Sequence, residues 1–196
     1  DGYRLHFMDL ALWEPYVRQV CRRHFSTPAG QVRPGLAGTF PTFIVDECWV
    51  VKFFGPLFEG ELGFQTELQV GRLLSADPSI PAPAVLASGR LFEEPSGWPW
   101  PYLIYKFIPG VSFGEAHRQV AMEDKLELAR QLGSVVRRIH QLPLVGAELF
   151  QPDWSAYLEF LRAQHAHCAQ NHRSWGTLPP RLVDQIDRFL LPVGDL

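Results

Sequence analysis

The sequence has few cysteines, and they lie far apart. Cys21, Cys48 and Cys168 are the three cysteines in 196 residues. An odd number of widely spaced cysteines argues against a disulfide framework and is typical of a reducing compartment. The sequence also has no apolar run of 18 residues, and it does not start with a signal-peptide pattern. We therefore expect a cytoplasmic protein with no membrane partner.

The sequence also lacks an excess of positive charge. Its formal net charge is −3, so it has no broad basic field, and we expect no binding to nucleic acid. Hydrophobic residues make up 46% and charged residues 20%, which is the profile of a soluble globular protein. No internal repeat is visible. The length suits one ordinary domain or two small ones.

A single charge stands inside the most apolar stretch of the chain. Within residues 36–54, two apolar runs at 42–45 and 48–54 are separated by Asp46 and Glu47, a pattern that predicts a β-hairpin. Lys52 lies in the second run and has apolar neighbours on both sides. An ammonium group in such a setting is costly unless it meets an anion. We therefore expect a negative group beside Lys52.

Two anions satisfy this expectation, and they are compatible. One is Glu67, which lies in a predicted helix over residues 61–75. The other is a phosphate group of a ligand. The alternative is that Lys52 extends into solvent from an edge strand and that Glu67 is an ordinary surface residue of the helix.

The rest of the first half predicts a small sheet with a helix on one face. A helix begins after Asp9, its predicted N-cap, and runs to about Phe25, and residues 26–34 predict a loop. Residues 84–92 and 101–107 predict two further strands. Together with the hairpin, these elements make four strands of an antiparallel sheet. The fold class that we expect is α+β with a small five-stranded antiparallel sheet, of which one strand is not located by these patterns.

Helices are predicted after Pro109 and Gly110. Ser112 and Glu115 have the spacing of a capping box. Helices are then predicted over residues 122–142, 154–171 and 182–191 from their apolar periodicity. His140 lies on the apolar stripe of the first of these, so we expect it to be a buried, hydrogen-bonded core residue.

Six segments, in this order, resemble the aminoglycoside phosphotransferase and choline kinase-like family, which has a protein-kinase-like fold. The resemblance covers roughly residues 10 to 145, although the kinase GxGxxG pattern is absent. The segments are Gly38-Thr39, Val50-Val51-Lys52, Phe64-Gln65-Thr66-Glu67, Ile80 to Gly89, Tyr102 to Gly110 and Leu132 to Pro143.

The resemblance implies a nucleotide-binding lobe over residues 1–107, followed by a hinge and the first helices of an incomplete C-terminal lobe over 108–196. It implies that Lys52 orients nucleotide phosphates and that Glu67 holds Lys52 in place. It further implies that a loop approaches the phosphates and that hinge backbone groups contact the adenine edge. The loop residues are Gly38, Thr39 and Phe40, and the hinge residues are Lys106 and Ile108.

The segment that carries catalysis in this family is not found in the sequence. The family has an H-G-D-x-x-x-x-N motif and a later metal-binding Asp. Only Val193-Gly194-Asp195-Leu196 resembles the first of these, and Asp195 is expected to lie in a loop. We therefore assign no catalytic and no metal-binding residue here, and we expect the Mg²⁺ ligands outside this chain. The resemblance implies transfer of the γ-phosphoryl group of ATP or GTP to a small-molecule hydroxyl by a longer parent enzyme, with this fragment inactive.

Two alternatives remain open. One is a pseudokinase-like module that binds a nucleotide or a protein without transferring phosphate. The other is a zinc site, because His165, Cys168 and His172 share one helix face at i, i+3 and i+7. A fourth ligand is missing for zinc, and in the family the helices of this region help to shape the acceptor pocket. The acceptor, the choice between ATP and GTP, and the oligomeric state stay open.

Overall fold

The computed structural model describes residues 6–36, 38–92, 97–144, 153–190 and 193–195. The chain divides into two compact units, Asp1–Leu149 and Phe150–Leu196. The predicted division into lobes at residues 107 and 108 follows the family resemblance rather than contacts within the chain, and it stays a prediction.

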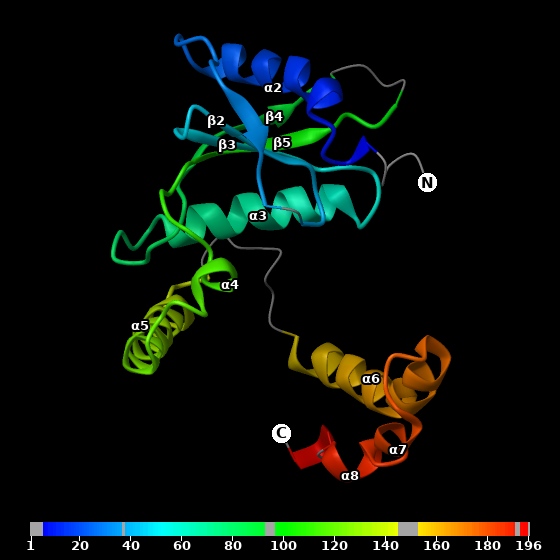
Figure 1. Cartoon of the computed structure of the whole chain (residues 1–196). Coiled ribbons are helices and arrows are strands. Elements are labelled where there is room, and N and C mark those ends of the chain that lie inside the picture. The colour runs from blue at the N-terminus through cyan, green and yellow to red at the C-terminus, as the bar shows by residue number, and fades with distance from the viewer. Residues whose placement is uncertain (1–5, 37, 93–96, 145–152, 191–192, 196) are drawn as a thin grey trace. The chain divides into compact units, whose positions relative to one another are not determined.

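A five-stranded antiparallel sheet forms the centre of the first unit (Figure 1). The strand order is β1-β2-β3-β5-β4, which places β3, the strand of Lys52, in the middle of the sheet. The alternative of an edge-strand lysine is therefore wrong. The strands are β1 (Val32–Pro34), β2 (Thr42–Val45), β3 (Trp49–Phe53), β4 (Val85–Arg90) and β5 (Pro101–Lys106).

The predicted loop over residues 26–34 ends in a strand. Val32 is buried and lies opposite Val45 in the β1–β2 pair, and Pro34 lies opposite Phe43. The proline at the end of this strand favoured a loop in the sequence. Pairing with β2 overrides that local signal, because β1 is the edge strand, where a missing N–H costs least.

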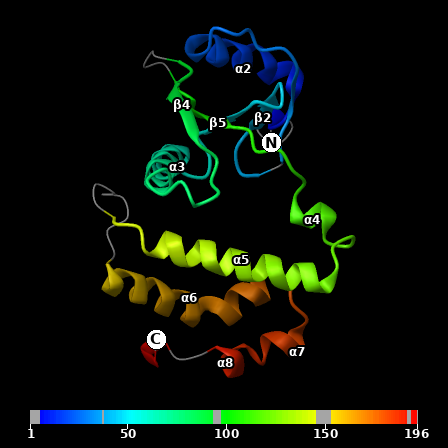
Figure 2. The same cartoon turned by 90° about the vertical axis from the view of Figure 1, so that its left-hand side faces the viewer.

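Two helices cover the two faces of the sheet. Helix α2 (Leu10–His24) lies against one face and α3 (Gly60–Leu74) against the other, as both views show (Figures 1 and 2). The predicted N-cap of α2 is confirmed, since the Asp9 carboxylate accepts from the Ala11 N–H at 3.0 Å. The sheet therefore has a helix on each face, whereas the sequence predicted a helix on one.

Alternation along the strands divides their side chains between these two faces. Val51 and Phe53 pack toward α2, where the Trp13 ring stacks on Phe53 with centroids 4.9 Å apart. Phe54 packs toward α3, in a cluster with Phe64. Lys52 follows the same alternation and lies on the α3 face.

The first unit continues with two helices whose side chains are largely exposed. In α4 (Phe113–Ala116), the capping box of Ser112 and Glu115 is confirmed. Helix α5 (Met122–His140) has no buried residue. The prediction of a core His140 is therefore wrong: its residue is exposed, because the described structure leaves the apolar stripe of α5 uncovered.

The second unit is helical. Its elements are α6 (Trp154–Trp175), α7 (Pro180–Val183), α8 (Ile186–Phe189) and the 3-10 helix η2 (Val193–Asp195). Helix α6 extends beyond the predicted residue 171 and ends at Gly176, whose φ of 63° closes it. Asp195 lies in η2 rather than in the predicted loop.

The single helix predicted over residues 182–191 is wrong as far as residue 190, and residue 191 lies outside the described residues. Two one-turn helices, α7 and α8, stand in its place and each buries one apolar side chain, Val183 and Ile186. The break lies at Gln185: the Asp184 N–H still donates to the Pro180 carbonyl at 3.0 Å, whereas the Gln185 N–H donates to the Leu182 carbonyl at 3.1 Å.

Candidate functional site

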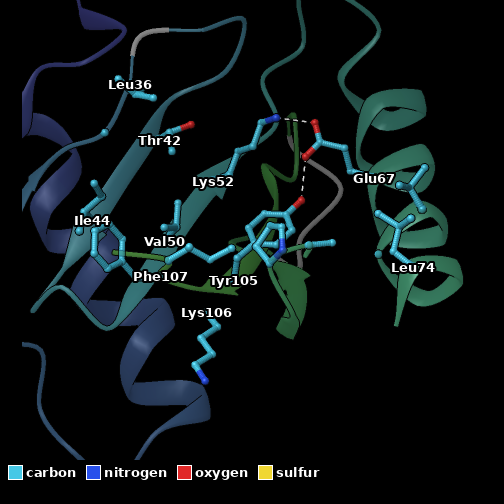
Figure 3. A pocket seen from close by; sticks show the side chains of 16 residues that line it. Leu36, Thr42, Ile44, Val50, Lys52, Glu67, Leu74, Tyr105, Lys106 and Phe107 are labelled. Carbon is cyan, nitrogen blue, oxygen red and sulfur yellow. Dashed lines mark hydrogen bonds and ion pairs between the residues drawn. The ribbon is translucent and has the colours of Figure 1, made fainter. Parts of the chain in front are cut away.

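A cavity of about 540 Å³ lies within the first unit, between the α3 face of the sheet and α3 itself (Figure 3). Most of its lining is apolar, and the sheet, α3 and the segments around β1, β4 and β5 all contribute. The lining residues are Gly35, Leu36, Thr42, Ile44, Val50, Lys52, Glu67, Val70, Gly71, Leu74, Ala82, Pro83, Tyr105, Lys106, Phe107 and Ile108.

Lys52 and Glu67 form an ion pair on the wall of this cavity. The Lys52 Nζ donates to Glu67 Oε1, and the two side chains are 23% and 35% exposed. The predicted partnership is confirmed, and the pair reaches the cavity rather than being sealed in the core. The partly exposed Lys52 side chain therefore remains accessible to a second anion in the cavity.

Two aromatic rings contact the ammonium group of Lys52. Its Nζ lies 5.5 Å from the ring centroid of Phe40 and 5.2 Å from that of Phe54, within range of a cation–π interaction. Phe40 is 6% exposed and packs on Phe54 with centroids 5.0 Å apart. Phe40 does not line the cavity, so it supports Lys52 from the core in this structure.

Tyr105 is a site residue that the sequence reasoning missed. Its hydroxyl donates to Glu67 Oε2 at 2.7 Å, so both carboxylate oxygens of Glu67 have a partner. Burial, and then the hydrogen bond to Glu67, raise the pKa of Tyr105 far above its usual value. Strand alternation offered a signal, because Tyr105 lies opposite Val50, two residues from Lys52 on the same face.

The loop between β1 and β2 contributes its ends to the cavity rather than its tip. The Gly35 N–H donates to the Thr42 carbonyl at 2.8 Å, and a Cβ at Gly35 would lie 3.1 Å from that oxygen. Gly38 and Thr39 do not line the cavity. A Cβ at Gly38 would meet nothing within 4 Å, and the predicted role of these two residues at the phosphates stays a prediction.

The predicted hinge follows β5 and borders the cavity. The N–H groups of Lys106 and Phe107 donate to the carbonyls of Ala84 and Cys48, each at 2.9 Å. No hydrogen bond among the described residues uses the Ile108 N–H, which leaves a donor at the cavity edge. The Lys106 side chain is exposed and points away from the Lys52–Glu67 pair (Figure 3).

The described residues contain no cluster of side chains of the kind that usually binds a metal ion. They contain no group of three or more His, Cys, Asp or Glu side chains that could hold one. Glu67 is the one carboxylate among the residues that line the cavity, and both its oxygens already accept hydrogen bonds, so these lining residues do not make up a Mg²⁺ site. His165, Cys168 and His172 line a separate cavity of about 280 Å³ in the second unit without forming a metal site.

No helix among the described residues has the length and apolarity to cross a bilayer.

Comparison with known proteins identifies the family. The model of the Phosphotransferase enzyme family matches residues 35–195. Among solved structures, the GDP complex of wild-type aminoglycoside 2'-phosphotransferase-IIIa is similar with a TM-score of 0.66 and 16% identity, over 90% of this chain and 58% of that one. A GDP and kanamycin complex of the same kind of enzyme gives 0.63 and 18%, over 88% and 56%.

A third solved structure is the ternary complex of a related phosphotransferase with streptomycin and ATP, with a TM-score of 0.51 and 17% identity over 92% of this chain and 56% of that one. This chain thus spans a little over half the length of these structures. At such identities the likeness shows the fold: an antiparallel sheet with helices, as in protein kinases. Because the family model matches most of its length, the chain belongs to the Phosphotransferase enzyme family.

Proposed function

We propose that the cavity beside Lys52 binds ATP or GTP and that the whole protein transfers the γ-phosphoryl group to a small-molecule hydroxyl. The observation that carries this proposal is a charged Lys52–Glu67 pair on the wall of an otherwise largely apolar cavity. A volume of about 540 Å³ is in the range of small-molecule sites. The apolar walls suit a base, and the ammonium group suits its phosphates.

In this proposal the base and the phosphates occupy different parts of the cavity. The base lies between Val50 and Leu74 and receives a hydrogen bond from the unused Ile108 N–H. The phosphates lie at the Lys52 ammonium group, which Glu67 keeps in position. Phosphoryl transfer depends mainly on positioning and on stabilising charge, and these residues supply both for the donor nucleotide.

The acceptor is proposed from the neighbours. The similar structures are named as complexes with kanamycin and with streptomycin, and aminoglycosides carry many hydroxyl groups. We propose an aminoglycoside-like acceptor for the whole protein. We propose no catalytic carboxylate and no Mg²⁺ ligand among the described residues, which hold no group of three or more His, Cys, Asp or Glu side chains that could bind a metal ion.

Measuring how tightly the Lys52→Ala variant binds ATP or GTP tests the proposal. Removing the ammonium group should weaken ATP or GTP binding by about 10- to 100-fold, the usual range for a charge-assisted contact with phosphate. Lys125→Ala is the matched control, because Lys125 lies on α5, away from the cavity lining. Calorimetric titration measures both affinities, and circular dichroism checks that both variants fold. Equal ATP affinity in Lys52→Ala and the wild type would refute the assignment.

A module that binds nucleotide without transferring phosphate is the second candidate. The observation in its favour is that Glu67 is fully engaged and that the described residues offer no magnesium site. Transfer of labelled phosphate from ATP to kanamycin by the whole protein separates the two. Transfer favours the enzyme, whereas nucleotide binding without transfer to any acceptor favours the module.

A further inference from the structure

We propose that Tyr105 is a positioning residue for phosphate binding: its hydroxyl fixes Glu67, and Glu67 in turn holds the Lys52 ammonium group toward the nucleotide. This inference rests on the proposed function of the cavity. It adds a third member, contributed by β5, to the pair that the sequence predicted.

The geometry around Glu67 carries the inference. One carboxylate oxygen accepts from Lys52 and the other from the Tyr105 hydroxyl, at 2.7 Å for the latter (Figure 3). A carboxylate held at both oxygens by donors from two strands has one orientation. With Lys52 as the sole partner, Glu67 could follow the flexible lysine, since its side chain is 35% exposed and has several rotamers.

The sheet register explains how Tyr105 reaches Glu67. On the neighbouring strand Tyr105 lies opposite Val50, and Leu103 lies opposite Lys52. Tyr105 and Lys52 are therefore diagonal neighbours on the face that α3 covers. The tyrosine ring packs against the cluster of Phe64 and Leu103, so its hydroxyl is presented from a rigid position.

The donor is also permanent. Burial raises the pKa of Tyr105, and the adjacent Glu67 carboxylate raises it further, because a tyrosinate would be both desolvated and repelled. The Tyr105 hydroxyl consequently keeps its proton over the whole pH range in which proteins are folded. It donates to Glu67 without competing for the charge of Lys52.

A second tyrosine on the same strand provides the control. Tyr102 is 2% exposed and its hydroxyl lies 2.8 Å from His24 Nε2, on the α2 face of the sheet. It does not line the cavity. Tyr102→Phe and Tyr105→Phe thus remove the same atom from the same strand, one on each face.

The experiment measures the affinity of the 196-residue chain for ATP and for adenosine, which lacks the phosphates. Tyr105→Phe should weaken ATP binding by about five- to tenfold, the scale of one hydrogen bond to a charged group, and should change adenosine binding by less than about twofold. Tyr102→Phe should leave both affinities within about twofold. Thermal unfolding of each variant records any loss of stability separately.

A double variant decides whether the hydroxyl acts through the lysine. In a Lys52→Ala background, Tyr105→Phe should have no further effect on ATP affinity. Additive losses would overturn the inference, and so would equal losses for ATP and adenosine or unchanged ATP binding in Tyr105→Phe. A weakened Lys52→Ala with an unaffected Tyr105→Phe refutes this inference alone. Wild-type protein that binds no ATP refutes the proposed function as well.

Discussion

Helices α3 and α5 carry similar apolar stripes, yet they bury different amounts of them. Phe64 of α3 is 6% exposed and meets Phe54 of the sheet with ring centroids 5.6 Å apart. On α5, Leu126 and Leu132 are 53% and 63% exposed, and no residue of the helix is buried. An amphipathic pattern specifies which face of a helix is apolar, whereas a partner surface decides whether that face is buried.

The sheet explains the difference between the two helices. Two neighbouring strands present a continuous, largely apolar surface on the α3 side, with Leu103 and Tyr105 on β5 and Phe54 at the end of β3. Helix α3 follows directly after β3 and packs on that surface. We therefore expect side chains between the sheet and α3 to contribute more to the free energy of unfolding than side chains on α5.

The largest effect is expected for a matched pair of leucine truncations. Leu103 is fully buried and Leu132 is 63% exposed. Leu103→Ala should lower the free energy of unfolding by about 2–5 kcal/mol, because it leaves a cavity between the sheet and α3. Leu132→Ala should change it by no more than about 0.5 kcal/mol. Urea denaturation measures both, and similar losses in the two variants would mean that α5 is packed in solution.

Cysteine labelling gives a second, kinetic comparison. Burial raises the pKa of the Cys21 thiol from 9.0 to about 11, and this residue is fully buried on the side of α2 that packs on the sheet. Cys48 is exposed and Cys168 is half-buried. At pH 8 a pKa of 11 alone lowers the reactive thiolate fraction about a hundredfold.

Mass spectrometry of iodoacetamide-treated protein should therefore show Cys48 labelled first, Cys168 next and Cys21 last. Urea should abolish the order, since all three thiols are then exposed. Labelling of Cys21 as fast as Cys48 in native protein would show that the packing of α2 on the sheet is loose.

The smallest effect is expected from His24, which bonds the Tyr102 hydroxyl at the end of α2. Partial desolvation, and then the positive charge of Arg23, lower the pKa of His24 below 6.5. The folded state therefore binds fewer protons than the unfolded state between the two pKa values. The contribution of His24 to the free energy of unfolding is fully present above pH 6.5, and it is lost as the pH falls through the folded-state pKa of His24.

Denaturation at pH 7.5 and pH 5.5 measures this contribution. The wild type should lose more stability across this range than His24→Gln, which has no titrating group at this position. A wild type and a variant with the same pH dependence would show that His24 is as well hydrated as in the unfolded chain.

Much of the first unit could be predicted from local patterns. Lys52 stood out because a charge interrupts an apolar strand, and the structure pairs it with Glu67 as expected. The N-cap Asp9 and the capping box at Ser112 were also found, because capping depends on residues two or three positions apart.

Contacts between distant segments explain what the sequence missed. Tyr105 joined the site only through the β3–β5 register, and its partner Glu67 lies 38 positions away. Val32 formed a strand because β2 paired with it. His140 had the periodicity of a core residue, but the described structure leaves it exposed.

The sequence by itself determined where the longer helices and the central strands form and which side chains face the same way, because these follow from local propensity, capping and periodicity. Only the tertiary structure decided which apolar faces are buried, that Tyr105 is the second partner of Glu67, and how a cavity forms beside Lys52. Those outcomes depend on surfaces from distant parts of the chain coming together, and no local pattern records the distance between them.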